Sequence, residues 1–153
     1  MKKIALLIKT ILFVSLILSA GCSVIKSPII EPVVLEGSEQ DEVLAYALEP
    51  AENLLNGLIA QNYAQFSANF SSNMSQGMNE QAFNDLLTML DTKLGSYQSA
   101  ELVTVLKEET YSTLVYRLTY EKDNEVSMRV VFDLNEPHQI SGLWFDSPVL
   151  RGN

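Results

Sequence analysis

The hydrophobic positions of the chain follow two different periods, and the change falls close to residue 96. Between residues 43 and 94, apolar side chains recur at spacings of three and four, which is typical of amphipathic helices. From residue 97 to residue 145 the spacing becomes two, which is typical of strands with one buried face. Helices followed by strands predict an α+β domain, with about three helices on a four-stranded antiparallel meander.

The first helix should carry its apolar stripe over residues 43–59. Pro50 lies within this stripe, and proline removes one backbone donor and crowds the preceding turn. The pattern therefore predicts either one kinked helix or two helices with Pro50 at the first position of the second.

Two further helices are expected before the change of period. Asn62 is placed to cap a short helix with an aromatic face, and the Ser/Asn/Gly-rich residues 71–77 indicate a break after it. The third helix should begin after Asn79 and end at Gly95, because asparagine caps helix starts and glycine ends helices.

Four strands with short connections are expected in the second half, and short connections favour antiparallel neighbours. The expected strands cover residues 97–107, 112–120, 126–134 and 139–145. Trp144 lies in the last of them beside Gly142, where a missing side chain leaves room for close approach or a bulge. We expect Trp144 to be a core residue, although strict alternation allows it to lie on a binding face.

The N-terminus has the order of regions of a bacterial secretory signal. A basic start precedes an apolar run over residues 4–18, which is interrupted by Lys9 and is shorter than the ~20 residues of a membrane span. The run ends in Leu18-Ser19-Ala20-Gly21-Cys22, which resembles the lipobox of bacterial lipoproteins. The resemblance implies that Cys22 is diacylated and becomes the mature N-terminus; the alternative is an ordinary cleavage site with an incidental cysteine.

This interpretation divides the chain into a lipoprotein signal peptide (1–21), a lipidated cysteine and tether (22–40) and a single α+β domain (41–153). It predicts an extracytoplasmic protein anchored to the cell membrane, or to the outer membrane if the cell has two. The tether contains Pro28 and Pro32, which oppose helix, but it is unusually apolar. It is either an added edge strand or a recognition strip; we favour a loose tether with partial docking.

Charge and cysteine content exclude several classes of function. The formal net charge is −9, and removal of the signal would take three lysines with it. Nucleic-acid binding needs a cluster of cations, and flat adhesion to anionic lipid needs a basic surface, so contact with the membrane should run through the lipid anchor alone. Cys22 is the only cysteine, so a disulfide, a cysteine metal site and a cysteine nucleophile are not expected.

Catalytic motifs are not evident. His138 is the only histidine and lies in a turn after Pro137, where we expect it to be solvated. The serines between residues 67 and 75 lack the glycines of a nucleophile elbow, and residues 123–125 lack the spacing of a calcium loop. No catalytic residue, metal site or cofactor is predicted.

One pocket deserves consideration because an isomerase needs a carboxylate base and a phenolic donor in apolar surroundings. Tyr116, Tyr120 and Phe132 fall on the inward phase of the two central strands, and Asp85 on the third helix could approach them. The simpler interpretation is that the aromatic residues belong to the core and that Asp85 is solvated.

Four phrases carry a resemblance to a known family: Ala51-Glu52-Asn53-Leu54-Leu55, Asn62-Tyr63-Ala64-Gln65-Phe66, Lys93-Leu94-Gly95-Ser96-Tyr97 and Ile140-Ser141-Gly142-Leu143-Trp144-Phe145. Residues 41–148 resemble uncharacterised bacterial secreted or lipoprotein domains with the cystatin-like α+β cone of nuclear transport factor two. That cone hosts isomerases, dehydratases, transport adaptors and noncatalytic modules, so the resemblance implies a fold rather than an activity.

We therefore expect a lipid-anchored, noncatalytic domain that binds a small apolar ligand or a protein partner in or beside the cone. An isomerase- or hydratase-type enzyme that uses a cone-shaped pocket is the alternative. A buried acid beside Tyr116 or Tyr120 would favour the enzyme, whereas a filled interior or an open sheet face would favour binding.

Overall fold

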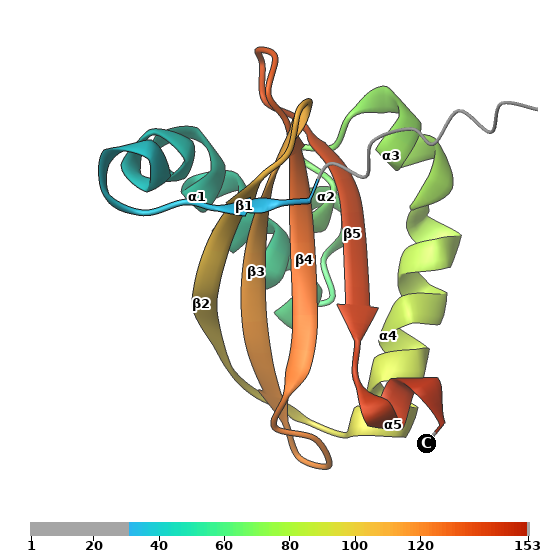
Figure 1. Ribbon diagram of the computed structural model, residues 1–153. Coiled ribbons are helices and arrows are strands. Elements are labelled where there is room, and N and C mark those ends of the chain that lie inside the picture. The colour runs from blue at the N-terminus through green and yellow to red at the C-terminus, as the bar shows by residue number, and fades with distance from the viewer. Residues whose placement is uncertain (1–30, 153) are drawn as a thin grey trace, which may run out of the picture.

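Five antiparallel strands form one sheet, and their spatial order is their order along the chain (Figure 1). The structure is a computed structural model, and it describes residues 31–152. The strands are β1 (Val33–Val34), β2 (Tyr97–Lys107), β3 (Tyr111–Tyr120), β4 (Val126–Asp133) and β5 (Ile140–Asp146). The α+β class is therefore confirmed, but the sheet has five strands rather than four.

The fifth strand comes from the expected tether. Val33 and Val34 pair with Lys107 and Leu106 at the end of β2, and the Leu35 amide donates a hydrogen bond to the Val105 carbonyl at 2.9 Å. The Leu35 side chain is buried with the core. The packed part of the chain thus begins before residue 41, where the sequence placed the start of the domain.

Five helices occur in the described residues, against the three expected. They are α1 (Gly37–Ile59), α2 (Tyr63–Phe66), α3 (Ser72–Gly77), α4 (Glu80–Leu94) and α5 (Pro148–Arg151). Pro50 lies inside α1, so of the two alternatives for this stretch, one continuous helix is observed rather than two separate helices. None of the helices within residues 31–152 has the length and hydropathy that crossing a bilayer requires.

Side-chain caps explain where the short helices begin. The side chains of Asn62 and Asn79 accept backbone hydrogen bonds at the starts of α2 and α4, as the sequence predicted. Ser71 does the same for α3 by accepting from the Met74 amide at 3.2 Å. The expected break at residues 71–77 is therefore a capped helical turn.

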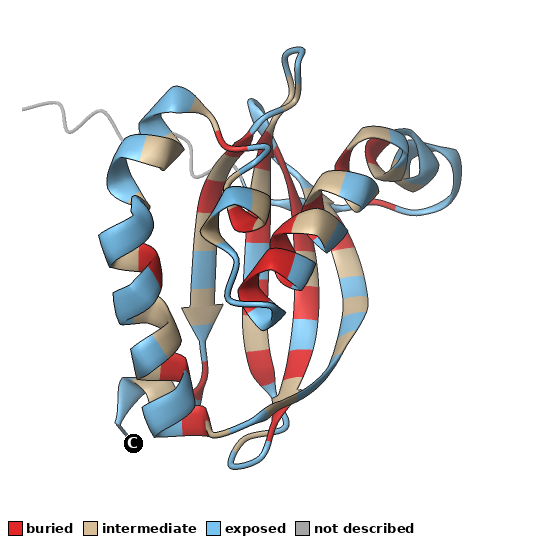
Figure 2. Cartoon of the chain, turned by 180° about the vertical axis from the view of Figure 1, so that it is seen from behind, coloured by how far each residue is buried: buried red, intermediate tan, exposed pale blue. Residues whose placement is uncertain are grey.

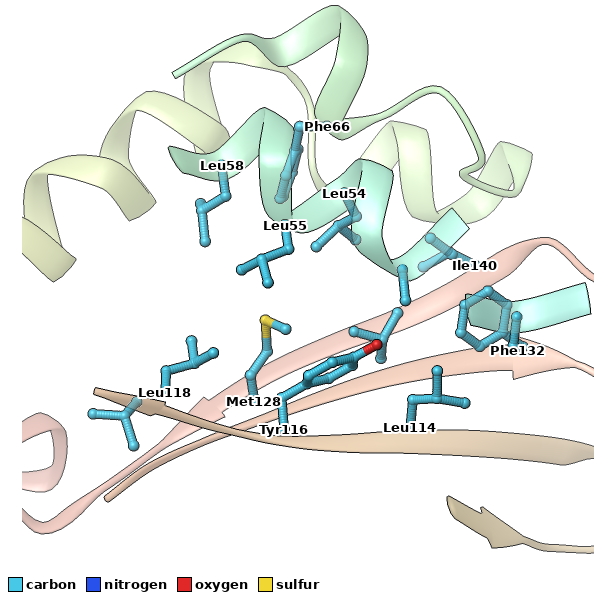
Figure 3. Close-up of a cluster of buried hydrophobic side chains, with 14 of the residues drawn as sticks. Leu54, Leu55, Leu58, Phe66, Leu114, Tyr116, Leu118, Met128, Phe132 and Ile140 are labelled. Atoms are coloured by element: carbon cyan, nitrogen blue, oxygen red, sulfur yellow. The ribbon is translucent and has the colours of Figure 1, made fainter. Parts of the chain in front are cut away.

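The core lies between one face of the sheet and the helices α1, α2 and α4. Figure 2 shows this side, with α1 and α2 in front of the strands, and Figure 3 shows leucines of α1 directed at the strand side chains. The period-two pattern is clearest in β4, where alternate residues are buried. The inward residues of the central strands are Leu114, Tyr116, Leu118, Tyr120, Val126, Met128, Val130 and Phe132.

Two irregularities bend β2 around this core. Its register with β3 shifts between Tyr97 and Ser99 and again between Leu102 and Thr104. An extra residue on one strand bends that strand and increases its twist. The sheet therefore curves around α1 and α2, and its convex outer face lies on the side away from them (Figure 1).

Candidate functional site

Exposed apolar side chains gather on the strands. Of the six large hydrophobic residues that are exposed in the described part of the chain, only Ile59 belongs to a helix. The other five lie on strands: Val33, Val34, Val103, Tyr111 and Trp144. Isolated exposed apolar residues are ordinary, but a group on one element type marks a candidate contact surface.

A groove of about 460 Å³ crosses the outer face of the sheet. We call it the outer groove. Its lining comes from β2, β3, β4 and β5 and from the residue that precedes β1; these residues are Pro32, Leu106, Glu108, Tyr111, Thr113, Arg129, Val131, Ser141 and Trp144. Thr113 is only 5% exposed, so it forms the floor rather than the rim. An open groove across several strands suits an extended occupant better than a compact one.

Trp144 is part of this surface, so the expectation that it belongs to the core was wrong. Its side chain is 57% exposed, and its register partner on β4 is Arg129, which lies on the outer face. The physical reason is a bulge: Phe132 pairs with Ile140 and Val131 pairs with Gly142, so β5 holds one extra residue, Ser141.

This bulge changes which side chains of β5 face inward. Ile140 before the bulge is buried, and Leu143 and Phe145 after it pack against the core. Gly142 and Trp144 are consequently left on the outer face. The indole lies over Gly142, because a Cβ built there would come within 2.3 Å of two ring carbons.

The charges of the outer face are few. Arg117 and Glu101 form an ion pair at 2.6 Å, and this hydrogen bond and charge raise the pKa of Arg117. Arg129 lines the outer groove and makes no ion pair within residues 31–152. Glu108 also belongs to the lining. The groove thus combines five apolar side chains with two small polar residues, one cation and one acid.

Tyr116 and Phe132, two residues of the predicted pocket, lie in a filled interior. Phe132 is fully buried and Tyr116 is 5% exposed, with its ring among leucines of α1 and the neighbouring strands (Figure 3). The Tyr116 hydroxyl has no hydrogen-bond partner in the described structure. Burial, and secondarily the charge of Glu52, raise the pKa of Tyr116 to about 12.

Tyr120 lies at the other end of the interior, beside a surface hollow of about 330 Å³. Leucines of α1 and α4, Tyr97 and Asp91 also line this hollow. Burial, and then the neighbouring Tyr97, raise the pKa of Tyr120 to about 12. Asp85 does not line it: this residue is exposed on α4 and accepts a hydrogen bond from Gln81 at 3.0 Å. The structure therefore does not bring Asp85 together with the tyrosines.

His138 has a structural contact that the sequence did not suggest. Its ring stacks on Tyr46 of α1 with centroids 3.9 Å apart, and its Nδ1 lies 3.1 Å from the Asp133 carbonyl oxygen. The expectation of a solvated side chain was wrong, since His138 is half-buried. Across residues 31–152, no three histidine, cysteine or acidic side chains are grouped as metal ligands would be.

A family described as "Protein of unknown function (DUF3887)" matches residues 51–143, which is more than half of the sequence. The chain belongs to this family. The matched DUF3887 region starts within α1 and ends within β5, so it contains the helical layer and most of the sheet. No curated protein and no solved structure matches the chain.

The sequence contained one indication of the outer groove, namely apolar residues at outward strand positions. A strand with one buried face ordinarily carries polar residues on its other face, yet Leu106 and Val131 occupy outward positions of β2 and β4. Apolar residues out of phase with the core mark a strand whose second face is also in contact with something. Cys22, the predicted lipidation site, lies outside the described residues.

Proposed function

We propose that this DUF3887 protein is a lipid-anchored, extracytoplasmic, noncatalytic domain that binds an apolar partner through the outer groove. The observation that carries this proposal is the position of Trp144, a large exposed aromatic residue at the edge of an apolar groove. Aromatic residues in such positions are enriched among those that dominate binding energies. Most of the opposite face of the sheet is covered by the core, which favours binding on the outer face.

The shape of the groove favours an extended apolar protein segment over a small ligand. Four strands contribute to its lining, and it is not an enclosed cavity. Small-molecule sites are usually concave enough to bury most of their ligand, whereas extended peptides lie on sheet surfaces and edges. The same groove would accept a small apolar ligand more weakly.

The anchor is supported by the sequence of residues 1–22, in which a signal-like apolar run ends at a lipobox-like cysteine. Two acyl chains give stable attachment where one is marginal. Labelled palmitate should enter the wild-type chain and be absent from Cys22→Ala; unchanged membrane partitioning of that variant would contradict the anchor.

The likeness to the cystatin-like cone of nuclear transport factor two is supported by the order of elements and by the curved sheet around α1. In a cone of this type a ligand would enter between the helices and the sheet. The filled interior around Tyr116 and Phe132 opposes that route here.

An isomerase- or hydratase-type activity is the second candidate, and one observation favours it: Tyr120 and Asp91 line the same hollow. Such chemistry needs the carboxylate in apolar surroundings, and Asp91 is exposed. The arrangement therefore supports this activity less well than binding at the outer groove.

A fluorescent apolar probe, anilinonaphthalene sulfonate, tests the proposed binding face. Trp144 is the only tryptophan, so energy transfer from it reports probe bound nearby. Leu106→Glu and Val131→Glu should each weaken probe binding by about tenfold, because charge opposes an apolar contact. Ile59→Glu is the matched control on the helical side. Weakening by Ile59→Glu alone, with thermal unfolding preserved in all three variants, would contradict the proposal.

A further inference from the structure

The chain enters the described structure at the outer groove itself. Pro32, one of the first described residues, lines the groove together with Trp144 and Val131. The chain then pairs as β1 and buries Leu35. The segment that precedes Pro32 therefore starts at a position that is fixed beside the groove.

The composition of that preceding segment matches the surface it reaches. Residues 24–30 read Val-Ile-Lys-Ser-Pro-Ile-Ile, with four apolar side chains among seven. Solvated linkers are ordinarily rich in Gly and Ser, which makes them flexible coils, or in charge, which extends them by self-repulsion. Apolar side chains of this kind are instead typical of a segment that lies on a surface.

We propose that residues 24–30 lie across the outer groove, with Ile29 and Ile30 against Val131 and Trp144. This inference rests on the proposed binding role of the groove and names its resident occupant. A partner would then have to displace this segment, which we call the N-terminal strap.

The distances across the sheet allow this arrangement. Strands β2 and β5 are three strand spacings apart, which is about 14 Å. An extended chain covers that distance in about four residues, so the residues just before Pro32 suffice to cross the groove. Attachment to the same chain also gives the strap an effective concentration in the millimolar range, which favours it over a free competitor.

The strap also fixes the position of the domain relative to the anchor. With residues 24–30 seated, only Ser23 connects the strap to Cys22. One extended residue spans about 3.5 Å, so the outer face would be held close to the bilayer. Displacement of the strap would lengthen the connection and release the domain.

Disulfide trapping in the membrane-anchored full chain tests the contact directly. Ile30→Cys combined with Val131→Cys should give a disulfide within one chain. The matched control pairs Ile30→Cys with Thr119→Cys, which is on the outer face of β3 beyond the groove lining. Equal trapping of both pairs, or a disulfide-linked dimer instead of an intramolecular bond, would overturn the inference.

The apolar probe separates failure of the strap from failure of the binding face. In the mature chain carrying Cys22→Ser, Ile29→Asp with Ile30→Asp should strengthen probe binding about tenfold, because the competitor is removed. Val24→Asp with Ile25→Asp, at the far end of the strap, should have a smaller effect. Equal binding to the wild type and the Ile29/Ile30 variant overturns the strap but leaves the binding face. If the probe binds neither the wild type nor the Ile29/Ile30 variant, both the strap and the binding face are overturned.

Discussion

The indole of Trp144, which lines the outer groove, lies over the backbone of Gly142. A Cβ at residue 142 would stand 2.3 Å from two carbons of the ring. At Gly57 in α1 the same addition would stand 2.3 Å from the backbone nitrogen of Phe66. An exposed ring can rotate away, whereas the backbone of a packed helix cannot.

The first prediction compares these two glycines. Gly142→Ala should change the free energy of unfolding by less than about 1 kcal/mol while it shifts the Trp144 emission spectrum, because the ring moves off the strand. Gly57→Ala should cost about 1–3 kcal/mol, since α1 and α2 must separate. Urea unfolding followed by circular dichroism measures both values. A large loss of stability in Gly142→Ala would mean that the ring is fixed by contacts other than Gly142.

The second prediction concerns the contribution of the Trp144 side chain to the free energy of unfolding. Trp144→Ala should lower the free energy of unfolding by less than about 1 kcal/mol, as expected of an exposed side chain. Phe132→Ala, on the inward face of β4, should lower it by about 3–5 kcal/mol. Thermal melts of the two variants measure this difference. Comparable losses of stability would mean that Trp144 is a core residue.

Much of the fold could be predicted from the sequence because the helical stripe and the two central strands have clear periods. The helix after Asn79 and the strand over residues 126–133 appear where expected. Trp144 was placed on the wrong face. Gly142 indicated room for a bulge, but in a strand that is apolar on both faces it did not show that the bulge at Ser141 would turn the indole outward. Alternation places a residue correctly only while the register is unbroken.

The docked N-terminal residues show a different limit. Val33 and Val34 form only a two-residue strand, and their partners in β2 are distant in sequence. Pairing of this kind depends on tertiary contacts, so the sequence left an edge strand and a recognition strip as alternatives. The outer groove could not be predicted for the same reason, since residues from four strands and Pro32 line it.

The third prediction uses the unpartnered hydroxyl of Tyr116. Tyr116→Phe should leave the free energy of unfolding unchanged or raise it by about 1 kcal/mol, because a buried polar group without a partner is removed. Tyr46→Phe is the control: its hydroxyl lies 3.0 Å from the Ser112 hydroxyl, and its loss should cost about 1 kcal/mol. Chemical denaturation measures both, and marked destabilisation by Tyr116→Phe would indicate a hydrogen bond in the interior.

The fourth prediction is the loss of stability at high pH. Burial raises the pKa of Tyr116 and Tyr120 to about 12 from an ordinary value of 10.0. The folded chain therefore holds these protons more tightly than the unfolded chain. Stability should be complete below pH 10 and should fall as the pH rises toward 12, by about 1.4 kcal/mol per pH unit for each group.

Tyrosinate absorbance and denaturation across this pH range test the prediction, and Tyr116→Phe should reduce the slope by the contribution of one group. Titration of all six tyrosines near pH 10 in the folded chain would contradict it.

The most direct test of the proposed function is photocrosslinking in cells, with benzoylphenylalanine at one surface position of the membrane-anchored full chain. Arg129 lines the outer groove and Ile59 is exposed on the helical side, so these positions sample the two faces. The account predicts covalent products from position 129, identified by mass spectrometry as the N-terminal strap or a partner that has displaced it, and none above background from position 59. Products from position 59 alone, or from neither position, would contradict it.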